Sequence, residues 1–358
     1  MNRRARVIAL YLPQFHPIPE NDRWWGKGFT EWTNAAKAKP MFRGHYQPHI
    51  PADLGFYDLR VPETRLAQAE MAGKHGIEAF CYYHYWFAGK RLLERPFDEV
   101  LRSGEPSFPF CLCWANQTWS GIWHGCPDRI LMEQTYPGED DHRAHFEYLL
   151  KAFTDPRHVT VDGKPLFLVF RPTEIPDIGR VTEIWREMAH RAGLKGLHIV
   201  WMQEPELPEH TGFDALSISR FSPDGNVTFK DDSVKWIRRE LSYYQRRLLN
   251  RPKIYSYQDA VTWFMQGQKP EYTYYPCLLP NWDNTPRSNS NGFLLHGSTP
   301  ELFRLQVKHA LECTRGVPLE RNLFVVKSWN EWAEGNHLEP DLKFGLSYLE
   351  VLRDEITR

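Results

Sequence analysis

The stretch LFVVKSWNEWAEGNHLEP, residues 323–340, joins a short apolar run to a dense group of polar and aromatic residues. Its first four residues are apolar and include two valines, which predicts a buried β-strand at 323–326. Two acids, Glu331 and Glu334, follow this strand three residues apart and lie among tryptophans. We therefore interpret the end of this strand as the candidate functional site of the chain.

The Glu331–Glu334 pair suits the cleavage of a glycosidic bond, which needs two carboxyl groups near one bond. Tryptophan rings bind the apolar faces of sugars. One carboxyl must have its pKa raised by burial, against Trp332 or a similar ring, while the other stays ionised. The structural alternative is a solvated pair in the first turn of a helix, where acids favour the N-terminus. Gly335 permits a sharp turn, so the spacing does not give the distance between the carboxyls.

Composition and charge narrow the kinds of partner. The chain has 358 residues and a net charge of −1, without the basic surplus that indicates nucleic acid or an anionic membrane. Aromatic residues make up 14 % of the chain, including 14 tryptophans, which suits an uncharged oligosaccharide or polysaccharide. The oligomeric state is not predicted.

Several features indicate a protein of the reducing cytoplasm. The six cysteines form no CxxC pair and most lie in expected strands, so we interpret them as reduced and buried. The basic N-terminus MNRRAR is followed by the apolar residues 7–12 without a small-residue cleavage site, which predicts a first strand rather than a signal peptide. No apolar run is long enough to predict a membrane-spanning helix.

Short apolar runs alternate with helical patterns along the whole chain. Strands are expected at residues 6–12, 77–86, 108–114, 166–170, 197–202, 215–218, 273–279 and 323–326. Helices are expected at residues 62–75, 97–102, 140–153, 180–192, 233–249, 257–265, 300–313 and 342–356. In the first of these helices, the side chains of Leu66, Ala69, Met71 and Ala72 are expected to point inward. This order predicts parallel β/α units.

Polar and aromatic residues collect at the ends of six of the expected strands. A (β/α)₈ barrel builds its active site there, whereas a doubly wound sheet concentrates such residues at one crevice. No glycine-rich phosphate turn follows the first strand. The sequence therefore predicts an α/β protein in which residues 1–358 form a single (β/α)₈ TIM barrel with long βα loops.

Other residues that suit a sugar ring or hydroxyl lie at these strand ends and in the aromatic loop after the first strand. The substrate-binding candidates are Glu31, Trp32, Tyr83, His84, Trp86, Trp114, Asn116, Trp119, Trp282, Asp283, Arg287, Asn330 and Trp332. Because alternate residues of a strand point to opposite faces, Tyr83, His84 and Trp86 can face a pocket only in part. An ion pair that shapes a loop is the structural alternative for Asp283 and Arg287.

We expect neither a metal nor a cofactor. The sequence contains no HExxH, Walker or GxSxG motif. No second histidine stands at ligand spacing from His84. Glu339 is expected to be structural, because Pro340 and the closing helix follow it.

Several stretches are similar to a known family. The run WNEWAEG at 329–335 resembles the catalytic motif of glycoside hydrolase family 99. Together with it, four further stretches resemble the WbsX group, which is called glycoside-hydrolase-99-like: LYLPQFH at 10–16, GFTEWTN at 28–34, CYYHYWF at 81–87 and WDNT at 282–285.

This resemblance implies a (β/α)₈ barrel and the retaining cleavage of an α-mannoside-like bond. In family 99 the first Glu of the motif assists the 2-hydroxyl of the substrate as a general base, which gives a 1,2-anhydro sugar, and the second Glu is the acid and then the base. The resemblance thus assigns the first role to Glu331 and the second to Glu334. WbsX-type proteins are also described as glycosyltransferases of O-antigen or other surface polysaccharides. The lack of a nucleotide-binding pattern favours hydrolysis.

Overall fold

The computed structural model describes residues 3–121, 126–202, 210–218, 250–266 and 272–357. Eight parallel strands form a nearly closed barrel, in the order β11-β10-β9-β5-β2-β1-β15-β13. They are β1 (Arg6–Tyr11), β2 (Ala79–His84), β5 (Phe110–Trp114), β9 (Lys164–Val169), β10 (His198–Met202), β11 (Ala215–Ser217), β13 (Cys277–Leu278) and β15 (Leu323–Val326). The predicted TIM barrel is confirmed.

Among the described residues, a single backbone bridge joins the sixth and seventh strands of the barrel. The Leu216 amide donates to the Thr273 carbonyl at 2.9 Å, and the Tyr275 amide donates to the Leu216 carbonyl at 2.8 Å. The seventh strand is therefore shorter than the expected 273–279, because its first residues meet β11 only at this bridge. The first and last strands pair directly, from Arg6 opposite Leu323 onwards.

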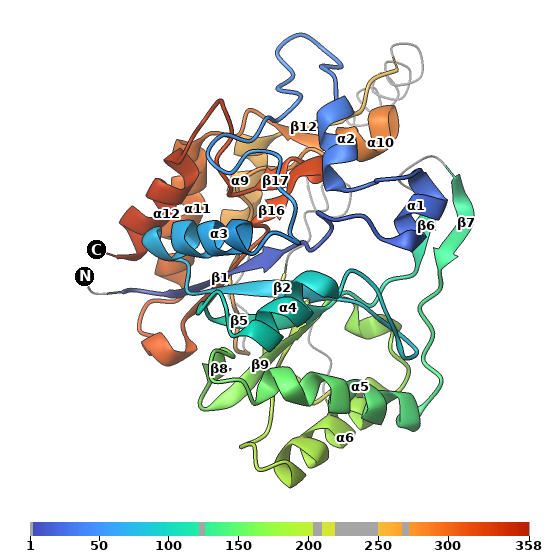
Figure 1. Ribbon diagram of the computed structural model, residues 1–358. Helices are drawn as coiled ribbons and strands as arrows, with labels where there is room; N and C mark the ends of the chain where they lie inside the picture. The colour runs from blue at the N-terminus through green and yellow to red at the C-terminus, as the bar shows by residue number, and fades with distance from the viewer. Residues whose placement is uncertain (1–2, 122–125, 203–209, 219–249, 267–271, 358) are drawn as a thin grey trace, which may run out of the picture.

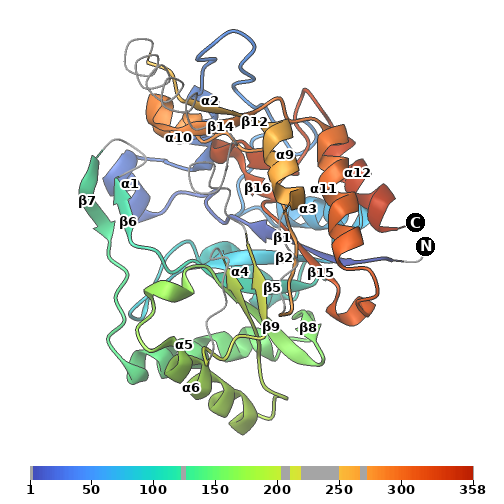
Figure 2. The same cartoon turned by 180° about the vertical axis from the view of Figure 1, so that it is seen from behind.

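Helices cover the outside of the barrel. Those that follow the strands are α3 (Pro62–Lys74), α4 (Arg95–Ser103), α5 (Glu139–Phe153), α6 (Ile178–Arg191), α9 (Tyr257–Gln266), α11 (Pro300–Cys313) and α12 (Ser347–Ile356). Figures 1 and 2 show α3, α11 and α12 on one side and α5 and α6 on another. The helix expected at 233–249 lies outside the described residues.

The loops at the carboxyl ends of the strands contain secondary structure of their own. The loop after β1 includes α1 (Pro19–Trp25) and α2 (Glu31–Lys37), and α10 (Thr285–Ser288) follows β13. Short strands pair as β3 (Trp86–Phe87) with β4 (Lys90–Arg91), β6 (Trp119–Gly121) with β7 (Cys126–Met132), β12 (Lys253–Ser256) with β14 (Phe293–His296) and β16 (Asn330–Glu331) with β17 (Asn336–His337), and β8 (Thr160–Val161) pairs with β9. The 3₁₀ turns are η2 (Pro172–Glu174), η3 (Asn289–Asn291), η4 (Leu319–Arg321) and η5 (Trp332–Glu334).

Two helices differ from their expected form. The last helix begins at Ser347 rather than at residue 342, because Asp341 first forms a turn in which its carbonyl accepts from the Gly345 amide at 2.8 Å. In α3, Leu66 is 46 % exposed, so the expectation that it points inward is wrong. Arg65 and Gln68 occupy the buried face instead. These two polar residues can be buried because each forms a hydrogen bond to another group inside the protein.

Among the described residues, every helix is too short or too polar to cross a membrane.

The packing of the helices predicts different effects for two leucine substitutions. Leu349 of α12 is fully buried, whereas Leu66 of α3 is exposed. Leu349→Ala should lower the free energy of unfolding by about 2–5 kcal/mol, because it removes buried methyl groups and leaves a cavity. Leu66→Ala is the matched control and should change it by about 0.5 kcal/mol or less. Chemical denaturation measures both values, and equal losses would contradict this packing.

Candidate active site

The two acids of the motif lie buried beside a lysine at the end of β15. The Nζ atom of Lys327 is 3.0 Å from Oε2 and 3.2 Å from Oε1 of Glu331, and 3.7 Å from Oε2 of Glu334. A hydrogen bond also joins the two carboxyl groups. Glu334 ends the 3₁₀ turn η5, so the acids do not share the face of a regular helix. The solvated helical pair, which was the structural alternative, is excluded by this geometry.

Arg287 connects this pair to a third buried acid. Its Nη1 atom donates to Oε1 of Glu334 at 2.6 Å, and its Nη2 atom donates to both carboxylate oxygens of Glu31 at 2.7 and 2.9 Å. Glu31 is fully buried at the start of α2 and also accepts from the Ala333 amide at 2.8 Å. The loop after β1 thus meets the turn after β15, and α2 and α10 lie beside each other over this turn (Figure 1).

The surroundings of the two acids shift their pKa values in opposite directions. Burial raises the pKa of Glu334, and the negative charge of Glu331 raises it further, against the opposing effect of two nearby cations. Burial also acts on Glu331, but the positive charge of Lys327 and a hydrogen bond from Glu334 bring its pKa below the ordinary value. A protonated Glu334 can donate to Glu331 and still accept from Arg287. The arrangement therefore favours a neutral Glu334 beside an ionised Glu331.

A tight turn holds Glu334 against Asp283. The Asp283 amide donates to the Glu334 carbonyl at 2.6 Å. Gly335 has a φ of +50°, and a Cβ atom there would lie 2.8 Å from Cβ of Asp283. Only glycine fits both the left-handed backbone and this close approach.

Asp283 is a support for this turn rather than a partner of Arg287. Its Oδ2 atom accepts from His45 Nε2 and Gln47 Nε2, both at 2.7 Å. Its Oδ1 atom accepts from the Thr285 amide at 2.9 Å. The alternative of an Asp283–Arg287 ion pair is therefore wrong, because Arg287 is held by Glu31 and Glu334.

Two predicted aromatic residues border the acids. Burial raises the pKa of Tyr83, near the end of β2, and the nearby negative charge of Glu331 raises it further. The Nζ atom of Lys327 lies 5.1 Å from the centre of the Trp282 ring, whose other contacts include a stacked Phe293 at 5.4 Å. The structure thus brings together Glu31, Tyr83, Trp282, Asp283, Arg287, Glu331 and Glu334.

Five of the candidates contact other parts of the protein. His84, Trp86 and Trp114 pack on α5 through His145, with ring-centre distances of 5.0, 4.8 and 4.6 Å. They point there because strand alternation turns His84 away from the face that Tyr83 occupies. The other two also have structural contacts: the amide of Asn116 hydrogen bonds to the backbone of Arg171, and Trp119 packs edge-on against Trp24, Tyr85 and Phe87. Whether any of these five also contacts a substrate stays a prediction.

The remaining three candidates support the loop behind the acids. Asn330 hydrogen bonds to both backbone groups of Leu12, at 2.7 and 3.1 Å, and so fastens the motif to the end of β1. Trp332 donates from Nε1 to Glu339 Oε2 at 2.6 Å, and its ring lies 5.3 Å from that of Trp32. Trp332 therefore hydrogen bonds to Glu339. These contacts do not support the expectation that the Trp332 ring buries the acid that donates a proton. The contact of these three with a substrate also stays a prediction.

Sequence reasoning missed Lys327, His45 and Gln47. The sequence carried a signal for Lys327, because a lysine that directly follows a buried strand needs an acidic partner. His45 and Gln47 had none, because they lie 238 and 236 residues before Asp283 in the chain.

The described residues form a (β/α)₈ barrel with a buried carboxyl pair after its eighth strand. The family model described as "Glycosyltransferase WbsX" matches residues 7–352, and the chain belongs to this family. Two relatives from Xanthomonas campestris pv. campestris, strains B100 and ATCC 33913, are both named "Uncharacterized protein WxcX". Each is 38 % identical to this chain, and the matches cover 99 % of this chain and 50 % of the relative. The chain therefore spans about half the length of these relatives.

Solved structures show the same fold at low sequence identity. A "Glycoside hydrolase-like protein" has a TM-score of 0.59 and 15 % identity, with 100 % of this chain and 95 % of that chain covered. The GH99 endo-alpha-mannosidase from Bacteroides thetaiotaomicron has a TM-score of 0.56 and 15 % identity, with 98 % and 96 % covered. The resemblance to the WbsX group and to the fold of family 99 is thus confirmed.

The raised pKa of Glu334 predicts a pH-dependent effect of Glu334→Gln on stability. The folded protein holds a proton on Glu334 that the unfolded chain releases once the pH passes about 4.3. The stability from this proton is complete below that pH and is lost as the pH rises through the raised pKa of the folded state. The amide that replaces this carboxyl carries no ionisable proton, so the variant should gain stability relative to wild type between pH 5 and pH 8, by about 1 kcal/mol or more.

Thermal unfolding at several pH values measures this difference. Glu350→Gln, which changes an exposed acid of α12, is the matched control and should follow the wild-type profile. Parallel profiles for wild type and Glu334→Gln would contradict a raised pKa at Glu334.

Proposed function

We propose that residues 1–358 act as one catalytic domain, a retaining glycoside hydrolase that cleaves a mannose-like or related linkage of a polysaccharide. The observation that supports this most is the buried carboxyl pair at the carboxyl end of the eighth strand, in which one acid favours a proton and the other favours the ionised form. An acid and a base of this kind, side by side, are what glycosidic cleavage requires.

Each acid has a distinct role in the proposed reaction. Glu334 donates its proton to the leaving oxygen as the bond to the anomeric carbon breaks. The 2-hydroxyl oxygen of the same sugar attacks that carbon while its own proton moves to Glu331, which gives a 1,2-anhydro sugar. Glu334 then takes a proton from water, and the water oxygen opens the three-membered ring at the anomeric carbon. The proton on Glu331 returns to the 2-oxygen, so both acids regain their starting states.

The neighbours of the acids support this division. Lys327 keeps Glu331 ionised, which makes it a weak base, so the 2-hydroxyl proton moves only as positive charge develops on the sugar. Arg287 orients Glu334 and is held in turn by Glu31. Trp282 and Tyr83 border the acids and are the proposed contacts for a sugar ring and a hydroxyl.

Removing either acid should slow hydrolysis strongly. With a panel of α-mannosides and bacterial surface polysaccharides, and no activated donor, wild type should release reducing ends. Glu334→Gln and Glu331→Gln should each lower the rate by about 10²–10⁴-fold, whereas Glu350→Gln should match wild type. An aryl glycoside whose leaving group needs no proton should separate the roles, because Glu334→Gln should lose much less rate on it than Glu331→Gln. Full activity of Glu334→Gln on polysaccharide would contradict the assignment.

A glycosyltransferase of O-antigen or other surface polysaccharide is the second candidate, and the description of the family favours it. The two functions differ in their need for a donor. Turnover only with a nucleotide sugar would support the transferase and contradict hydrolysis. Release of reducing ends from polysaccharide alone would support the hydrolase.

A further inference from the structure

Three buried side chains with metal-binding atoms meet next to the WNEWAEG segment, residues 329–335. They are His49 from the loop after β1, His337 from β17 and Asp341 from the turn before α12. One ligand atom from each lies within 4.8 Å of the other two. Nδ1 of His49 is 2.8 Å from Nε2 of His337, and Nε2 of His337 is 4.0 Å from Oδ2 of Asp341.

The hydrogen bonds of His337 direct its free nitrogen at the other two residues. Its Nδ1 atom is 2.9 Å from the Glu339 carbonyl, which can only accept, so Nδ1 carries the hydrogen. In the neutral ring Nε2 then has a lone pair, which accepts from Nδ1 of His49 at 2.8 Å and lies 4.0 Å from Asp341. A bound ion would replace the hydrogen on Nδ1 of His49. Metal-bound histidines show the same pattern, with the second ring nitrogen donating to a carbonyl or carboxylate. The Trp332 ring stacks on His337 at 3.8 Å and limits its rotation.

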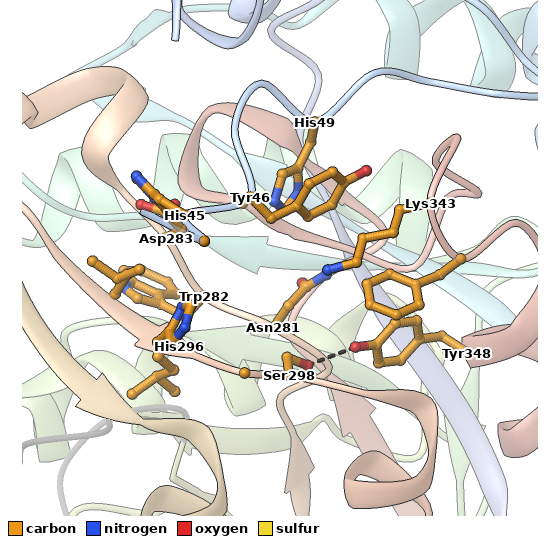
Figure 3. A pocket seen from close by; sticks show the side chains of 16 residues that line it. His45, Tyr46, His49, Asn281, Trp282, Asp283, His296, Ser298, Lys343 and Tyr348 are labelled. Atoms are coloured by element: carbon orange, nitrogen blue, oxygen red, sulfur yellow. Dashed lines mark hydrogen bonds and ion pairs between the residues drawn. The ribbon is translucent and has the colours of Figure 1, made fainter. Parts of the chain in front are cut away.

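The other two side chains are also held in place. Oδ1 of Asp341 accepts from the amides of Lys343 at 2.9 Å and Phe344 at 2.7 Å. These contacts leave Oδ2 as the oxygen nearer to His337. The ring of His49 stacks on Tyr46 with centres 4.3 Å apart, and Figure 3 shows the two rings together at the edge of a pocket.

We propose that His49, His337 and Asp341 bind a divalent transition-metal ion, with zinc as the best match. Two imidazole nitrogens and one carboxylate oxygen are a common set of three protein ligands for zinc, and a water or small ligand fills the fourth position. At usual bond lengths the ligand atoms of a tetrahedral zinc lie roughly 3.3 Å apart, and the separations of 2.8 and 4.0 Å lie on either side of that value.

An ion at this place would have a structural effect. His49 lines a pocket together with Tyr46, Asn281 and Lys343. The ion would join the loop after β1 to the residues that follow the WNEWAEG segment. That loop also carries the two side chains that hold Asp283 against the turn of Glu334. No short sequence motif indicates this site, because His49 and His337 are 288 residues apart.

A second histidine pair provides a matched comparison. His84 and His145 are also buried and face each other through Nε2 atoms 2.9 Å apart. That pair does not belong to a group of three possible ligands among the described residues. Both pairs are joined by a hydrogen bond between rings, but only His49 and His337 have a carboxylate, that of Asp341, in reach as a third ligand.

Zinc uptake by the full chain tests the proposal without any substrate, so the result is independent of the proposed hydrolysis. The purified protein is treated with a chelator, incubated with Zn²⁺ and dialysed, and bound zinc is measured by mass spectrometry. Wild type and His84→Gln should each retain about one ion per chain, and added Zn²⁺ should raise their melting temperatures. His49→Gln and Asp341→Asn should each lose both effects while keeping the wild-type circular dichroism spectrum.

Two outcomes would overturn the proposal. One is a wild-type chain that retains less than roughly a tenth of an ion and shows no change in melting temperature. The other is zinc retention by both His49→Gln and Asp341→Asn at the wild-type level. If one of these variants does not fold, the other variant and the wild-type measurement still decide the question.

Discussion

The candidate active site contains more buried acids than buried cations. Three carboxyl groups, those of Glu31, Glu331 and Glu334, surround only two cations, Lys327 and Arg287. Ionising all three acids in a buried site would leave a negative charge without a partner, which is costly. The imbalance is relieved when one acid holds a proton. Burial and the negative charge of Glu331 favour Glu334 as this acid, since it shares Arg287 with Glu31 and is farther from Lys327 than Glu331 is.

Distant segments keep these charges in place. The loop after β1 contributes Glu31 to the ion pairs, and its His45 and Gln47 hold Asp283 against the turn at Gly335. The end of β1 is fastened to the motif through Asn330. The barrel supplies a rigid base for these contacts, and the long loop after its first strand surrounds the end of its last. Because β1 and β15 are adjacent strands of the barrel, residues near the two ends of the sequence form one site.

Much of the fold could be predicted from the sequence, because the strands and helices follow local patterns. The apolar run of β15 and the alternation of strands and helices needed no tertiary information. The site was predicted less completely. Tyr83 and Trp282 border the acids, but His84, Trp86 and Trp114 pack on α5, because neighbouring strand positions face opposite sides. Leu66 was misplaced for a similar reason: the buried face of α3 carries Gln68, whose partner Glu339 lies 271 residues away.

The sequence by itself determined the barrel, the family resemblance and the position of Glu331 and Glu334 after the last strand, since these depend on local hydrophobic patterns and on a motif in consecutive residues. Only the tertiary structure decided which acid holds the proton, that Arg287 pairs with Glu31 and Glu334 rather than with Asp283, and that His49 meets His337 and Asp341. The physical reason is that pKa values and ion pairs depend on burial and on distances of a few ångströms between side chains. These distances are set by loops whose paths no local pattern encodes.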